Sequence, residues 1–206
     1  MLSRPNVGLG RSVSTRLRTC IFYNANDNGQ GFVVQLYPGS CFNPMGSAAA
    51  IQPVLYDQWK AMFARYVVTG ATVKITVTPQ VEQNAVSSVV SGVCAAYPST
   101  VDGPASGTAT FQGYASQAYA QSRQIIPSAP AAEMFFKLSA QKILGSRLPV
   151  LAEDHGGLVG ASPATGQFMT LPLFVQSSNG AAATYTIKID MVQDVTFDQR
   201  IQTVDA

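Results

Sequence analysis

The stretch YDQWKAMFARYVVTGATVKITVT, residues 56–78, decides how the chain folds. Apolar residues in its first half recur at helical spacing, whereas its second half alternates with a period of two. The helical half predicts a buried face made of Trp59, Met62, Phe63 and Tyr66. A short helix with so much apolar area needs a sheet to lie against. The stretch therefore predicts a short helix that leads directly into a half-buried strand.

The composition favours one large all-β domain in a chain of 206 residues. Charged residues make up only 12% of the chain, about half of the usual share in soluble domains. A weakly charged exterior is tolerable when other subunits cover much of it, so the composition is a first indication of obligate assembly. No apolar run approaches the length of a signal peptide core or a membrane span, which predicts a soluble protein that does not bind membranes.

The net charge of +2 is unevenly distributed along the chain. The first twenty residues contain no acid, and their basic residues are Arg4, Arg11, Arg16 and Arg18. This pattern is typical of contact with phosphate backbones, and an ordinary flexible terminus is the alternative. We expect residues 1–13 to form a partly mobile basic arm and residues 14–206 to form one domain.

Turn-forming clusters divide the rest of the chain into about eight predicted strands. Too few helices lie between them for a parallel sheet, and the long excursions between strands favour a jelly-roll sandwich over an immunoglobulin-like one. Pro172 predicts that its strand lies at a sheet edge or contains a bulge. The strands are expected at residues 14–23, 32–38, 72–78, 86–97, 123–126, 133–138, 167–176 and 184–197.

The sequence contains no recognisable motif for catalysis, cofactor binding or metal binding. Cys20, Cys41 and Cys94 lack paired or CxxC spacing and are expected to be reduced and mostly buried. The sole histidine, His155, would serve either as a metal ligand or as a general base with Cys94 or Cys20 as the nucleophile; a solvated loop residue is the alternative.

Two further sets of residues have both a functional and a structural interpretation. The acids Asp190, Asp194 and Asp198 share one strand face, where they would either bind calcium between subunits or form a salt-bridged surface. The aromatic residues Phe111, Tyr114 and Tyr119 would either stack on bases or pack.

The order of these segments resembles the capsid proteins of small circular single-stranded DNA viruses, the circovirus-like group. In the first matching segment the resemblance rests on Tyr56, Asp57, Trp59, Phe63, Tyr66, Val68, Lys74, Ile75 and Val77. In the second it rests on Phe136, Ser139, Lys142, Ile143, Gly145, Leu158, Gly160 and Pro163. The closing strand TYTIKIDMVQDVTF is also similar, so the resemblance spans roughly residues 14–200.

The resemblance implies a single viral jelly roll whose copies, about sixty in the smallest icosahedral shell, package a single-stranded DNA genome. The implied partners are further copies of the chain and the genome, and the implied location is the virion, with assembly in the host nucleus or cytoplasm. Family members carry a long basic arm, whereas this arm is short, which departs from the family pattern. A capsid protein of a small RNA virus and a jelly-roll module that binds carbohydrate or another ligand are the alternatives.

Overall fold

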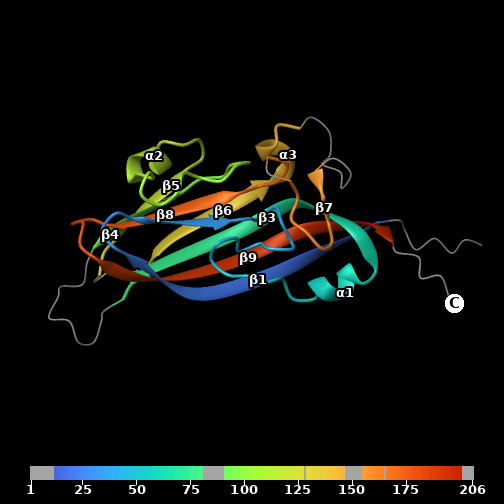
Figure 1. The fold of residues 1–206 in the computed structure, drawn as a ribbon, viewed down its shortest axis with the longest axis horizontal. Helices are drawn as coiled ribbons and strands as arrows, with labels where there is room; N and C mark the ends of the chain where they lie inside the picture. Colours follow the sequence, from blue (N-terminus) through green and yellow to red (C-terminus); the bar gives the residue numbers. More distant parts are fainter. Residues whose placement is uncertain (1–11, 81–90, 128, 147–154, 165, 201–206) are drawn as a thin grey trace, which may run out of the picture.

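Two antiparallel sheets packed face to face make up the protein (Figure 1). The computed structural model describes residues 12–80, 91–127, 129–146, 155–164 and 166–200. The first sheet has the order β1-β9-β3-β6, and the short strand β7 also pairs with β3. The second has the order β2-β8-β4-β5. In each sheet, strands far apart in sequence are neighbours, which is the connectivity of a jelly roll.

The first sheet is built around two long strands, β3 (Phe63–Pro79) and β9 (Ala183–Arg200). On one side, β9 pairs with β1 (Ser12–Asp27), and on the other side β3 pairs with β6 (Ala132–Ser139). The two-residue strand β7 (Gly157–Leu158) pairs with the start of β3. β1 begins at Ser12, so the last two residues of the expected arm, 12 and 13, belong to this strand. Residues 1–11 lie outside the described part of the chain, and the arm stays a prediction.

The second sheet consists of β2 (Phe32–Leu36), β8 (Leu171–Ser177), β4 (Gly92–Ala96) and β5 (Gln121–Ile125). The expectation that Pro172 marks an edge strand is wrong, because β8 lies between β2 and β4. The β4 ladder ends where Ala96 pairs with Leu173, one residue before Pro172 would have to take part. A proline at the end of a ladder removes no hydrogen bond, so the interior position is tolerated.

The alternation in the last strand places its apolar residues in the core, as predicted. Tyr185, Ile187, Ile189, Met191, Val195 and Phe197 are all buried. Gln193 interrupts this series and is also fully buried. Its Nε2 donates hydrogen bonds to the backbone oxygens of Pro38 and Ser40, both at 2.9 Å, and thereby holds the loop after β2 against the first sheet.

The helix predicted in the first stretch is shorter than expected. The helix α1 spans only Tyr56–Lys60, and β3 begins at Phe63, so Phe63 and Tyr66 are buried strand residues and not helix residues. Met62 was expected in the core but is 41% exposed. The register of β3 with β9 is regular from Phe63 to Val68, yet Phe63 and Tyr66 are both buried. Their rings both pack near that of Phe197, with centroids 6.0 and 6.4 Å away, and this shared burial imitates helical spacing.

Two further helices in the described residues are the five-residue α2 (Phe111–Ala115) and the four-residue α3 (Ala140–Ile143), which lie on the opposite side of the sandwich from α1 (Figure 1). From α1, the half-buried ring of Trp59 stacks on Phe197 with centroids 5.5 Å apart and planes at 15°. In the described part of the chain, no helix has the length and apolar character that a membrane span requires.

Candidate functional site

The outward face of the first sheet carries most of the charged side chains that the sequence assigned to function. Strand alternation turns every second residue of β1, β9, β3 and β6 away from the core. The register aligns Cys20, Asp190, Lys74 and Phe135 in one row across four strands. Charges that are far apart in the sequence therefore become neighbours on this face.

Each of the two described arginines of the basic N-terminal region is paired with an acid of β9. Arg16 Nε lies 2.7 Å from Asp194 Oδ1, and Arg18 lies 3.4 Å from Asp190 Oδ1. Lys188 Nζ approaches the other oxygen of Asp190 at 2.9 Å. These contacts leave the surface between β1 and β9 with nearly balanced charge.

The ion pairs act on the protonation of Asp190. Partial burial alone would raise the pKa of its carboxyl, but hydrogen bonds from Cys20, Lys188 and Arg18 and the positive charge of Lys188 outweigh burial and hold the pKa below the usual range. The same carboxylate raises the pKa of Lys188, chiefly through its hydrogen bond. Both groups are therefore charged at neutral pH, and the pair persists there.

The four arginines predicted to contact nucleic acid fall into two groups. Arg4 and Arg11 lie outside the described part of the chain, and Arg16 and Arg18 share their charge with acids. The contacts remain a prediction.

Of the acids considered for an intersubunit calcium site, Asp190 and Asp194 pair with bases, whereas Asp198 accepts a hydrogen bond from the N–H of Gln199. The described residues contain no group of three or more His, Cys, Asp or Glu arranged to hold a metal ion.

Cys94 lies on a strand of the second sheet, whereas His155 lies outside the strands. Cys94 is on β4 in the buried core, and burial raises the pKa of its thiol to about 12, which makes it a poor nucleophile at neutral pH. His155 precedes β7, beside the first sheet. Cys20 was expected to be buried but is exposed on the outer face of β1, where a hydrogen bond to Asp190 raises its thiol pKa.

The three aromatic residues proposed for base stacking have different roles in the fold. Tyr114 is buried, and its ring packs at 5.4 Å from that of Phe174 and 5.2 Å from that of Tyr97, so it belongs to a small core under α2. Phe111 is half-buried against the same core. Tyr119 alone is exposed, at 87% of its surface, and it adopts a left-handed backbone with φ of 60°.

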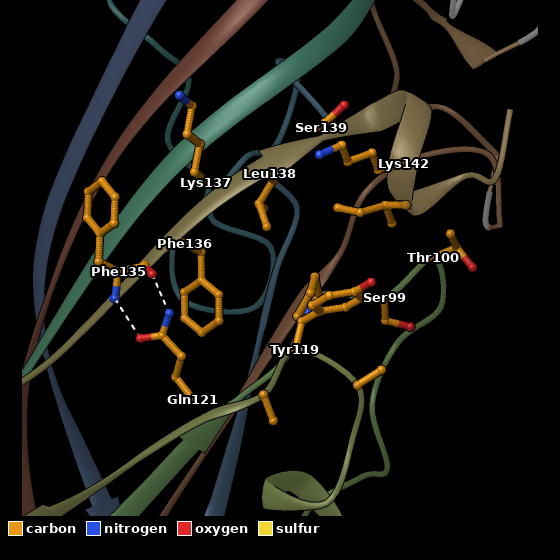
Figure 2. A pocket seen from close by; sticks show the side chains of 14 residues that line it. Ser99, Thr100, Tyr119, Gln121, Phe135, Phe136, Lys137, Leu138, Ser139 and Lys142 are labelled. Atoms are coloured by element: carbon orange, nitrogen blue, oxygen red, sulfur yellow. Dashed lines mark hydrogen bonds between the residues drawn. The ribbon is translucent and has the colours of Figure 1, made fainter. Parts of the chain in front are cut away.

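Sequence reasoning missed a groove between the two sheets, where β6 and β5 face each other (Figure 2). Its volume is about 690 Å³, and its walls come from β6, α3, the segment 98–100 and residues 118–121. Tyr119 lies in this groove. Its aromatic ring, a candidate for base stacking, was the one signal of the groove that the sequence contained. The groove itself depends on which strands face each other, and no local pattern encodes that.

The strand order β1-β9-β3-β6 facing β2-β8-β4-β5 defines the jelly roll of viral capsid proteins. A virus-like particle of the giant freshwater prawn Macrobrachium rosenbergii nodavirus has this fold, with a TM-score of 0.50 and 13% identity over 98% of this chain and 100% of that chain. At this identity the likeness shows the fold alone.

Two further capsid structures resemble the chain at somewhat lower scores. The Desmodium yellow mottle tymovirus structure has a TM-score of 0.48 and 13% identity, covering 100% of this chain and 91% of that one. The 60-mer of the BFDV capsid protein has a TM-score of 0.47 and 14% identity, covering 97% and 99%. By sequence, no family profile and no curated protein matches the chain.

Proposed function

We propose that the protein is the shell subunit of a small icosahedral virus and assembles with copies of itself around a single-stranded DNA genome. The observation that carries the proposal is the complete capsid-type jelly roll, formed by a chain in which only 12% of the residues are charged. The chain's resemblance to circovirus-like capsid proteins supports DNA as the genome and about sixty copies per shell, the number in the smallest icosahedral arrangement.

Exposed apolar side chains near α1 support self-assembly. Val54 is 73% exposed, and Leu55 and Met62 are also exposed large apolar residues at this end of the molecule. Several large apolar side chains exposed within a short segment are typical of protein interfaces. Leu55 adopts a left-handed backbone with φ of 71°, which is strained for a leucine and persists where surrounding structure requires it.

Electron microscopy of the purified chain tests assembly. We expect closed particles of uniform diameter, with a mass by native mass spectrometry that corresponds to about sixty copies. Val54→Asp places a charge at the apolar end and should prevent particle formation while leaving the circular dichroism spectrum unchanged. A monodisperse, folded monomer at every salt concentration and pH would contradict the proposal.

The genome type is tested on the same particles. Nucleic acid that survives external nuclease should be degraded by DNase and resist RNase after the shell is opened. Protected RNA would instead favour the alternative, a capsid protein of a small RNA virus. Particles without nucleic acid would leave the structural role standing and remove the packaging role.

A further inference from the structure

Side chains, and not a strand, cover part of the outer edge of β6. The side-chain amide of Gln121 binds both backbone groups of Phe135: its Oε1 accepts from the N–H at 3.1 Å, and its Nε2 donates to the carbonyl oxygen (Figure 2). Arg123 Nε donates to the carbonyl oxygen of Glu133 at 2.9 Å. From residue 133 to residue 135 this edge is therefore protected against pairing with another strand.

The protection ends at Lys137. In an antiparallel ladder, alternate residues direct their backbone groups to the same side. Since Phe135 directs its N–H and C=O away from β3, Lys137 does so as well. Within the described residues, neither backbone group of Lys137 has a hydrogen-bond partner. An unpaired donor and acceptor on a strand edge form the site to which an added strand binds.

The groove of about 690 Å³ lies directly beside this unpaired edge. Phe136 and Leu138 point into it, whereas Lys137 points to the other side of β6 (Figure 2). Lys142 extends over its rim from α3 (Figure 2). A strand added here would thus have an apolar side toward the groove and a side facing a lysine, and in the described residues no ion pair engages Lys137 or Lys142.

We propose that the groove binds residues 201–206 (IQTVDA) of a second copy, which add to β6 as a strand. The inference rests on the proposed self-assembly. When Asp205 stands opposite Lys137, the alternation directs Val204 and Ala206 toward the apolar wall and the carboxylate toward the lysine. The basic residues 1–11 carry Arg4 and Arg11, have the same sign of charge as the groove, and contain proline and glycine, so they fit it poorly.

The segment cannot reach the groove of its own molecule. Arg200 pairs with Phe63 on β3, whereas Lys137 pairs with Thr72, nine positions further along the same strand. At the usual rise in a strand, these positions are about 30 Å apart. Six extended residues span at most about 20 Å. The contact therefore forms only between two copies, which makes it an assembly contact.

A fluorescent peptide of residues 201–206, titrated with the full chain diluted below its assembly concentration, tests the contact by anisotropy. We expect saturable binding. Lys137→Glu should weaken it about tenfold or more, because the new charge faces Asp205. A peptide with Asp205→Lys should then bind this variant and not the original chain. Lys60→Glu, a change at an exposed lysine on α1, is the matched control and should leave binding unchanged.

N-methylation separates backbone pairing from general charge attraction. The peptide methylated at the Asp205 nitrogen should lose binding, because that N–H faces the Lys137 carbonyl. The peptide methylated at Val204 should keep it, because that N–H points away from β6. Equal effects of the two methyl groups, or failure of the charge swap, would overturn the proposal. So would a single-stranded oligothymidine that displaces the peptide and loses affinity in Tyr119→Ala, since it would identify the groove as a nucleic-acid site.

The peptide-binding test and the particle-formation test can fail independently of each other. If the chain forms particles but the peptide does not bind, the groove assignment fails and the shell role stands. If the peptide binds and no particles form under any condition, the shell role fails and the groove assignment stands. If the shell role and the groove assignment are both correct, deleting residues 201–206 should lower the yield of particles and leave the thermal unfolding of the dilute chain unchanged.

Discussion

One carboxylate oxygen of Asp27 accepts a hydrogen bond from the backbone N–H of Ser177 at 2.7 Å and thereby ties the end of β1 to the end of β8. The other oxygen accepts from the N–H groups of Gly29 at 2.9 Å and Gly31 at 2.7 Å. Both glycines adopt left-handed conformations, with φ of 93° and 82°. Asp27 is only 2% exposed. A single buried carboxylate thus organises the first turn and joins the two sheets.

Asp27→Ala should lower the free energy of unfolding by about 3 kcal/mol or more, because it leaves several backbone N–H groups without a charged acceptor. Urea denaturation of the unassembled chain measures the change. Asn26→Ala, at the exposed neighbouring position, is the control and should cost less than about 1 kcal/mol. Equal losses for the two variants would show that the carboxylate does not organise the turn.

Gln193 should tolerate loss of its amide better than replacement by a carboxylate. Gln193→Leu removes two donors and leaves the carbonyls of Pro38 and Ser40 unpaired, at an expected cost of about 1–3 kcal/mol. Gln193→Glu retains the shape but directs a buried negative charge toward two carbonyl oxygens, so its cost should be larger. Chemical denaturation of both variants provides the comparison, and a smaller loss for glutamate would contradict the hydrogen-bond assignment.

The boundary between α1 and β3 predicts opposite responses at two adjacent residues. Phe63 is 4% exposed in the core, so Phe63→Ala should cost about 3–5 kcal/mol. Met62 is an exposed residue of the turn before β3, so Met62→Ala should change the stability of the isolated chain by less than about 1 kcal/mol. A large loss at Met62 in thermal or urea unfolding would support the longer helix expected from the sequence.

The lowered pKa of Asp190 predicts a pH-dependent contribution to stability. Because the folded chain binds this proton more weakly than the unfolded chain, the contribution is fully present above the unfolded pKa of about 3.9 and is lost as the pH falls through the folded pKa. Asp190→Asn should therefore be less stable than the original chain at pH 6, and the difference should shrink below about pH 4. A difference independent of pH would refute the linkage.

The arginines of the N-terminal region should fall into two classes in nucleic-acid binding. If Arg4 and Arg11 contact phosphates, their joint replacement by glutamine should reduce the salt slope of single-stranded DNA binding by about 1.4. The matched pair Arg16→Gln and Arg18→Gln should reduce it less, because Asp194 and Asp190 already engage these arginines. Filter binding at several salt concentrations measures the slopes. Equal reductions would show that the acids release the arginines on binding.

The sequence was sufficient to predict the sandwich, because its strands alternate cleanly where one face is buried. Residues 185–197 are the clearest case, since every apolar residue of the series proved to be in the core. Prediction failed where the burial of strand residues does not alternate. Phe63 and Tyr66 have helical spacing but belong to a strand, and pairing with β9, far along the chain, overrides the local preference.

The functional surfaces were less predictable, because they depend on contacts between distant segments. The four arginines look alike in the sequence, yet the register of β1 against β9 gives acid partners to Arg16 and Arg18. The exposure of Cys20 follows from its phase on β1, which a count of cysteine spacings does not contain. The groove beside Lys137 requires knowledge of which strands lie at the edges of the two sheets.

The long ladder between β1 and β9 sets the timing of folding. The register pairs Ser12 with Asp198, so the start of β1 obtains its partner only after more than 180 further residues have been synthesised. Contacts between such distant segments slow folding and leave unpaired edges exposed in the meantime. A nascent chain that lacks β9 would therefore present β1 as an open strand, and the first sheet closes only after both strands have been synthesised.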